Sequence, residues 1–185
     1  APMHEAIVGK NPRAAIRRAA PALAVEGSQA DSRSDKHIAT LHPRVRPYAR
    51  ALIPAAAAQG IIIKVISGTR SYAEQAELYR RYKAGGPLAA PPGRSNHNFG
   101  IAFDIGVFTG STDPEKARTY LPESSAYDTV GALAGSIGLS WGGNWKSKKD
   151  KPHFELRPAW AKELSDSAMV RRLAQRKVQG VDPFV

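Results

Sequence analysis

The stretch Ser95-Asn96-His97-Asn98-Phe99-Gly100-Ile101-Ala102-Phe103-Asp104 decides how the middle of this 185-residue chain folds. Apolar residues alternate from Ile101 onward, which predicts a strand with Asp104 on the face opposite to its large apolar side chains. His97 lies seven positions before Asp104, an odd separation that would put the two on opposite faces of one straight strand. We therefore expect the chain to turn between them, and Gly100 suits such a turn.

A second informative stretch is Asp150-Lys151-Pro152-His153-Phe154-Glu155. Pro152 lacks a backbone donor and disfavours helix at the residue before it, which predicts a loop that enters a short strand. His153 and Glu155 then share one face of that strand. Asp150 precedes His153 by three residues, close enough to act beside it.

The two stretches together predict a hydrolytic zinc site with His97, Asp104 and His153 as ligands. A catalytic zinc takes three protein ligands and keeps one position for water, and the absence of cysteine excludes a closed thiolate site. Such a metal lowers the pKa of bound water to about 7, and Asp150 could reach that water as a base without binding the metal. Taken singly, each histidine could instead be a structural hydrogen bonder, and an aspartate near glycine a turn residue.

These motifs resemble the M15-type zinc metallopeptidases, the D-alanyl-D-alanine carboxypeptidases and L-alanyl-D-glutamate endopeptidases that cut bacterial peptidoglycan stems. The resemblance spans about residues 32 to 160 and includes three further segments, Leu41-His42-Pro43, Ser67-Gly68-Thr69-Arg70-Ser71 and Trp141-Gly142-Gly143-Asn144-Trp145. The last segment, followed by Asp150 to Glu155, is most similar to the L-alanyl-D-glutamate branch, which includes phage endolysins.

The resemblance implies a role for each site residue. His97, Asp104 and His153 match the family's zinc ligands. Asp150 matches its catalytic acid/base, and Arg70 matches an arginine that steadies the scissile carbonyl or the oxyanion. A guanidinium suits this role because it stays protonated throughout, although a helix-flanking surface arginine is the alternative. The implied fold is α+β, a small antiparallel sheet with flanking helices on the zinc scaffold shared by hedgehog-type domains and D-Ala-D-Ala peptidases.

Three residues are weaker candidates for contact with substrate. Trp141 and Trp145 could wall the substrate groove, since indole rings offer large contact area at low entropic cost. Packing in the core is the alternative for Trp141. Ser95 could position His97 or the substrate backbone, or simply cap a turn.

The remaining pattern predicts one enzyme domain between two basic segments. We expect a basic, Ala-rich N-terminal helix with flexible flanks over residues 1–31, the zinc peptidase over 32–165, and a basic C-terminal helix and tail over 166–185. Two loops interrupt the enzyme domain: a polar insertion over 109–125, and a proline-rich loop over 85–93 that either lines the cleft or is a plain surface connection.

Individual elements follow from local signals. A first helix is expected over residues 44–59, and Pro54 should kink or divide it. A second helix should begin at the capping box of Ser71 and Glu74 and run to about Ala84. A third should end at Gly138, because apolar residues recur at helical spacing before that glycine. Residues 61–66 predict a buried strand. Residues 158–180 predict one or two helices broken near 165–167.

Composition and charge limit the partners and the location. The family resemblance implies action on the bacterial cell wall. No stretch approaches the length of a membrane span, and the N-terminal segment lacks the apolar core of a signal peptide, so we expect synthesis in the host cytoplasm and delivery by a holin, secretion or lysis. The net charge of +11 favours polyanions. Anionic wall polymers or lipopolysaccharide fit this charge. The sequence has no nucleic-acid-binding motif, so we expect no specific nucleic-acid partner. We expect a monomer.

Three functions from different classes remain open. The first is zinc-dependent hydrolysis of the L-Ala–D-Glu bond of peptidoglycan, as in an antibacterial endolysin. The second is a carboxypeptidase that removes terminal D-Ala. The third is a non-catalytic zinc module of the hedgehog type, against which Asp150 argues.

Overall fold

The computed structural model describes residues 30–185, so the basic helix predicted for residues 1–31 lies almost entirely outside the described residues. The described part is α+β, as predicted. Its helices are α2 (Ser32–Ile38), α3 (Arg46–Ala57), α4 (Tyr72–Lys83), α5 (Ala126–Ile137) and α6 (Asp166–Gln179). Its strands are β1 (Ile62–Ser67), β2 (Ala102–Thr109), β3 (Thr119–Leu121), β4 (Ser140–Trp141) and β5 (His153–Glu155). Short 3₁₀ turns are η1 (Asn96–Phe99), η2 (Gly142–Asn144) and η3 (Ala159–Ala161).

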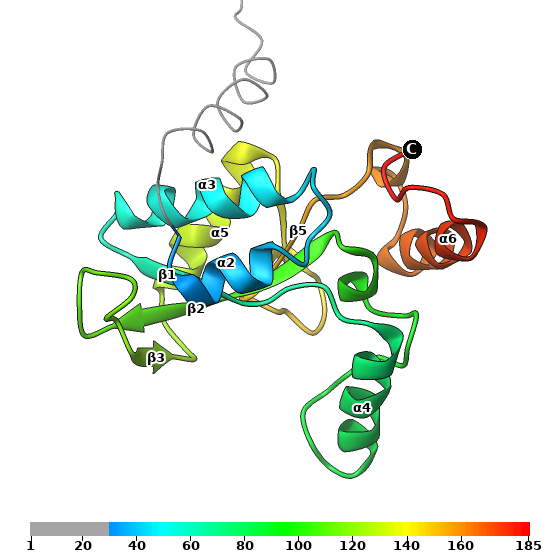
Figure 1. Cartoon of the computed structure of the whole chain (residues 1–185), viewed down its shortest axis with the longest axis horizontal. Coiled ribbons are helices and arrows are strands. Elements are labelled where there is room, and N and C mark those ends of the chain that lie inside the picture. The colour runs from blue at the N-terminus through cyan, green and yellow to red at the C-terminus, as the bar shows by residue number, and fades with distance from the viewer. Residues whose placement is uncertain (1–29) are drawn as a thin grey trace, which may run out of the picture.

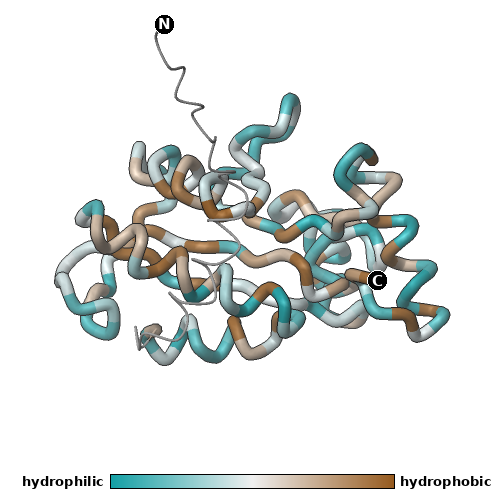
Figure 2. The backbone as a smooth tube through the Cα atoms, turned by 90° about the horizontal axis from the view of Figure 1, so that it is seen from above, coloured by the Kyte–Doolittle hydropathy of each residue, from teal (hydrophilic) through white to brown (hydrophobic). Residues whose placement is uncertain are grey.

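The strands of the described residues form one antiparallel sheet, in which β2 pairs with β1, β3 and β5. The strand order is β1-β2-β5-β4, and β3 pairs with the far end of β2. Helices α2, α3 and α5 gather on the sheet, while α4 and α6 lie apart from them toward the end opposite β3 (Figure 1). Figure 2 shows hydrophobic residues concentrated along the central strands and hydrophilic residues on the outer loops. Residues of the sheet, of α4 and of α6 line one cleft, which contains the candidate site residues.

The main core joins the sheet to α2, α3 and α5. Phe103, Ile105 and Val107 lie on one face of β2 and pack with Phe154 of β5 and Tyr127 of α5. This alternation leaves Asp104 on the other face, as the sequence predicts. Ile101 precedes the strand and joins a second cluster instead, because the backbone turns at Gly100.

The second apolar cluster attaches α6 to the site region. Met169, Val170 and Leu173 of α6 are buried against Phe99 of η1 and Ile101. The break predicted near residues 165–167 is present, since Ser165 caps α6 by accepting a hydrogen bond from the Ala168 amide. Treating residues 166–185 as a separate segment stays a prediction.

Local signals located most helices correctly. The capping box of Ser71 and Glu74 begins α4, and Gly138, with φ of +100°, ends α5. Helix α3 is not divided at Pro54, because only one backbone hydrogen bond is lost there while Leu52 and Ala56 hold the helix through buried packing. Helix α2 was not predicted, nor was β3 within the polar insertion.

Among residues 30–185, no helix has the length and apolar character required to span a membrane.

Candidate active site

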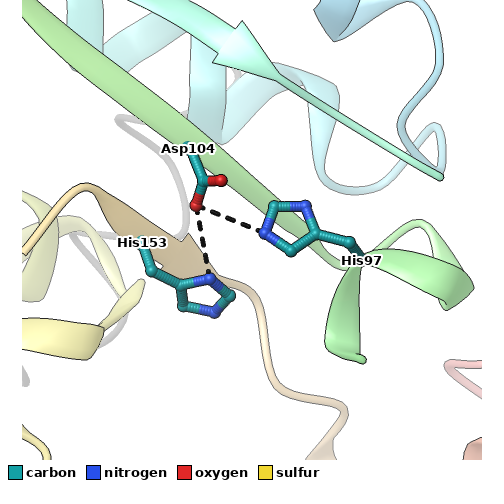
Figure 3. A group of neighbouring side chains, drawn as sticks. All are labelled: His97, Asp104 and His153. Atoms are coloured by element: carbon teal, nitrogen blue, oxygen red, sulfur yellow. Dashed lines mark ion pairs between the residues drawn. The ribbon is translucent and has the colours of Figure 1, made fainter. Parts of the chain in front are cut away.

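Three side chains from distant parts of the chain converge on one point (Figure 3). The Nε2 atom of His97 lies 3.2 Å from Oδ1 of Asp104, and the Nδ1 atom of His153 lies 3.5 Å from the same oxygen. One ligand atom of each residue lies within 4.8 Å of the others. The Oδ1 atom of Asp104 is buried and makes no hydrogen bond. Such a donor set, with a buried oxygen left unsatisfied between two imidazole nitrogens, fits a divalent metal ion.

Strand pairing explains how these residues meet. Asp104 and His153 are direct cross-strand partners in the β2–β5 ladder, which places their side chains on the same face of the sheet. His97 comes from η1, and the turn between it and β2 passes through Gly100 at φ of +76°, a backbone conformation that favours glycine. The turn predicted from the odd spacing is therefore confirmed.

Each imidazole is oriented by a different hydrogen bond. The Nδ1 atom of His97 lies 2.9 Å from the carbonyl oxygen of Gly68, so this nitrogen carries the proton and Nε2 faces the metal site. The Nε2 atom of His153 lies 2.9 Å from Oε1 of Glu155, so the opposite nitrogen, Nδ1, faces the site. Such contacts fix both the tautomer and the ring orientation of metal-binding histidines.

Glu155 is the site residue that the sequence reasoning missed. Its side chain is buried and accepts a second hydrogen bond, 2.7 Å long, from the amide of Asn96. The shared face of His153 and Glu155 was the available signal, because side chains two apart on a strand are neighbours. The local pattern could not predict the contact with Asn96, whose side chain reaches the Glu155 carboxylate from η1.

The protonation of the cluster reflects its burial and its charges. Burial opposes ionisation of Asp104, but attraction to the imidazoles of His97 and His153 outweighs it and holds the pKa of that carboxyl well below its ordinary value. Burial also disfavours charged His153, yet Asp104 and Glu155 more than compensate and raise its pKa. A metal ion must therefore displace a proton from His153, so metal affinity should increase with pH.

Arg70 lies against the metal cluster at the junction between β1 and α4. One guanidinium nitrogen is 3.3 Å from Oδ2 of Asp104 and 3.2 Å from the hydroxyl of Ser67. A register shift between Val65 and Ser67 places Ser67 opposite Asp104. Bulges of this kind often redirect side chains beside active sites. Here the guanidinium both steadies the Asp104 carboxylate and remains at the cleft surface.

An open cleft with a volume of about 810 Å³ contains the cluster. Asp150 lines it together with Arg70, and the proline-rich loop contributes residues 87–90 to its wall. Burial, followed by repulsion from Asp104, raises the pKa of Asp150. Asp150 thus lines the same cleft as the metal cluster without belonging to it, the arrangement expected of a base.

The weaker candidates separate into different roles. Trp145 lines the cleft, and its ring centroid is 4.9 Å from that of His153. Ser95 also lines the cleft, although its hydroxyl accepts a hydrogen bond from the His97 amide and so caps η1. Trp141 instead packs against the main core and donates from its indole nitrogen to the carbonyl of Lys151 at 2.7 Å. Its position favours the packing alternative.

Gly142 sets the position of the loop that carries Asp150. A Cβ atom there would lie 2.3 Å from the carbonyl oxygen of Asp150 and 3.1 Å from Cβ of His153. The Gly142 carbonyl accepts hydrogen bonds from the amides of Trp145 and Asp150. A side chain at this position would push Asp150 away from the cluster.

The sequence is similar to those of known peptidases. A family model described as D-alanyl-D-alanine carboxypeptidase, of the M15 peptidases, matches residues 89–156. The peptidoglycan L-alanyl-D-glutamate endopeptidase CwlK of Bacillus subtilis (strain 168) is 40% identical over 125 residues, which cover 64% of this chain and 74% of CwlK. The chain belongs to the M15 peptidase family. It is accordingly a peptidase.

Solved structures with a similar fold include two bacterial proteins. The L-Ala D-Glu endopeptidase ChiX of Serratia marcescens is 23% identical, with a TM-score of 0.48 over 71% of this chain and 92% of ChiX. DacB of Streptococcus pneumoniae D39 is 24% identical, with a TM-score of 0.49 over 83% of this chain and 86% of DacB.

Replacing Glu155 by glutamine in this M15 peptidase should weaken metal affinity by about 10- to 100-fold, the usual effect of losing a partner of a metal-binding histidine. Glutamine keeps the size of the side chain but no longer offers His153 a charged acceptor. Metal affinity can be measured by competition with a chromogenic chelator. An Asp166→Asn variant removes a carboxylate from the same cleft but not from His153, and should bind metal like the wild type; equal affinity in all three proteins would contradict the role of Glu155.

Proposed function

We propose that the protein is a zinc-dependent endopeptidase that hydrolyses the L-Ala–D-Glu bond of peptidoglycan stem peptides. The observation that carries the proposal is the pairing of a three-residue metal cluster with a separate carboxylate, Asp150, in one open cleft. Zn²⁺ is the metal that suits two imidazoles and one carboxylate in a hydrolase. The 40% identity to CwlK supports the choice of bond.

The chain's own residues have distinct tasks in this reaction. Bound zinc would supply a Lewis acid that polarises the amide carbonyl and makes water acidic. Asp150 takes the proton from the attacking water and delivers it to the leaving amine as the C–N bond breaks. Arg70 faces the same cleft and donates to the oxygen on which negative charge develops, a stabilisation whose loss typically raises a barrier by about 2.7 to 4 kcal/mol.

The immediate surroundings suit a polymeric substrate. The cleft is open to solvent, and α4, the proline-rich loop and the start of α6 line it. A stem peptide that is still attached to the polymer can therefore lie in the cleft. Trp145 offers an indole beside His153 as an apolar wall for a small side chain such as that of L-Ala. We accordingly place the protein's action at the bacterial cell wall, with peptidoglycan as its partner.

Digestion of purified muropeptides, followed by mass spectrometry, tests the proposal. We expect products cut between L-Ala and D-Glu in the presence of Zn²⁺ and intact substrate in the presence of a chelator. Loss of a single terminal D-Ala would instead identify the carboxypeptidase activity that the family description names. Intact substrate with zinc bound would identify a non-catalytic module.

A further inference from the structure

Four cationic side chains line the active-site cleft: Arg70, Arg81, Arg94 and Lys148. Two of them already pair with carboxylates, Arg70 with Asp104 and Arg81 with Glu77. Within residues 30–185, the side chains of Arg94 and Lys148 make no hydrogen bond or ion pair. Their charges are therefore available to an anionic ligand in the cleft.

The backbone on both sides of Arg94 is fixed by one buried side chain. The amides of Gly93 and Ser95 donate to Oδ1 of Asn98, at 3.1 and 3.4 Å. The amide nitrogen of Asn98 donates in turn to the carbonyl of Arg70 at 3.1 Å. Asn98 is only 2% exposed, so this linkage is shielded from water. The backbone of Arg94 is thus held in place relative to that of Arg70, while its side chain is exposed.

Lys148 occupies an unusual backbone conformation on another loop of the cleft. Its φ of +51° is the only positive value at a non-glycine residue in the described part of the chain. The loop is closed at its base, where the Trp145 and Asp150 amides both donate to the Gly142 carbonyl, at 3.2 and 3.0 Å. Left-handed backbone at a residue other than glycine, asparagine or aspartate is strained, and such residues cluster at functional sites.

We propose that Arg94 and Lys148 form a carboxylate subsite that reads the free carboxylate of the D-Glu residue next to the scissile bond. This inference rests on the proposed function. A glutamyl residue within a peptide uses one carboxyl for the next bond and keeps the other, whereas the L-Ala side chain is neutral. The charged group nearest to the scissile bond is therefore the free carboxylate of D-Glu, the residue whose amine leaves. Two unpaired cations in the cleft offer charge-assisted hydrogen bonds to it.

The amidated form of the same residue is a matched neutral substrate, because an amide replaces the carboxylate without a change of size. We expect the wild-type protein to cleave a stem with free D-Glu about 10 to 100 times more efficiently, by kcat/KM, than the stem with D-isoglutamine. Arg94→Gln and Lys148→Asn should each reduce this preference, and the double variant should cleave both substrates alike. Asparagine is chosen at position 148 because it tolerates left-handed backbone.

Lys149→Asn is the matched control. It removes the same charge from the adjacent position of the same loop, but Lys149 does not line the cleft, and its variant should keep the wild-type preference. Melting temperature and zinc content, measured for every variant, separate altered recognition from altered folding. The activity toward the amidated substrate should stay near the wild-type value in all variants that fold.

A double variant of Arg94→Gln and Lys148→Asn that keeps the wild-type preference would overturn the subsite. A wild-type protein that cuts both stems equally well overturns the subsite and leaves the proposed function intact. An equal loss of preference in Lys149→Asn would assign the effect to the general positive field, which also overturns it. Absence of cleavage between L-Ala and either form of the next residue would refute the proposed function itself.

Discussion

Replacing Asp150 by asparagine should lower kcat by about 10²- to 10⁴-fold, the usual contribution of a positioned acid or base. Asparagine keeps the shape of the side chain and the backbone hydrogen bond to Gly142, but it cannot accept the proton of the attacking water. Steady-state hydrolysis of a defined stem peptide measures the effect. Metal content should stay unchanged, because Asp150 is not one of the three converging ligands.

The stability of the Asp150→Asn protein provides an independent check. Burial raises the pKa of Asp150 above its value in the unfolded chain, so its ionisation at neutral pH opposes folding in the metal-free protein. The asparagine variant should then melt at the same temperature or a higher one. Asp166→Asn is the control for removing a carboxylate from the cleft. Asp166 forms an ion pair with Arg157 at 2.7 Å and has no part in the proposed reaction, so this variant should keep most activity. Wild-type turnover in metal-loaded Asp150→Asn would remove Asp150 from the mechanism.

Removal of the metal should abolish hydrolysis and lower the melting temperature by about 8 to 16 °C. A metal present at a thousand times its dissociation constant stabilises the folded state by about 4.1 kcal/mol, and each kcal/mol shifts the melting temperature of a domain of this size by about 2 to 4 °C. His97, Asp104 and His153 are far apart in the sequence and meet only through the fold, so the unfolded chain offers no comparable site. Scanning calorimetry with chelator, and then with added Zn²⁺, measures both changes.

Two histidine variants make this result specific. His153→Ala should melt at a temperature that no longer responds to Zn²⁺. His42→Ala should keep the full response, because His42 pairs with Asp182 and packs against the tilted ring of Phe184 outside the metal cluster. A melting temperature that ignores chelator in the wild-type protein would mean that the three side chains bind no metal.

Local sequence signals were enough for much of the candidate site. The alternation around Asp104, the turn at Gly100 and the capping box at Ser71 are all decided within a few residues, and the structure has each of them. The family resemblance added Arg70, which no periodicity would single out. Whether these residues act as assigned stays a prediction until the variants are measured.

Contacts between distant segments were the part that local patterns could not supply. The pairing of β3 with β2 depends on a loop closing back on the sheet, and its three residues carry too weak a pattern to stand out in a polar insertion. The packing position of Trp141 depends on Gly131, where a Cβ atom would lie 2.3 Å from the indole. Both features depend on tertiary contacts, which override local propensity.

The cross-strand pairing of Asp104 with His153 separates the geometry of the metal centre from the lengths of the loops. These two ligands are neighbours through the ladder of a sheet, so the loops among the 48 residues between them can change in length without altering the distance between the two ligands. A slip of one residue in that ladder would turn Asp104 toward the core and Phe103 toward the cleft. The same hydrogen bonds that define the fold therefore also fix the relative positions of two metal ligands. The surrounding loops remain free to change during evolution and so to alter substrate specificity.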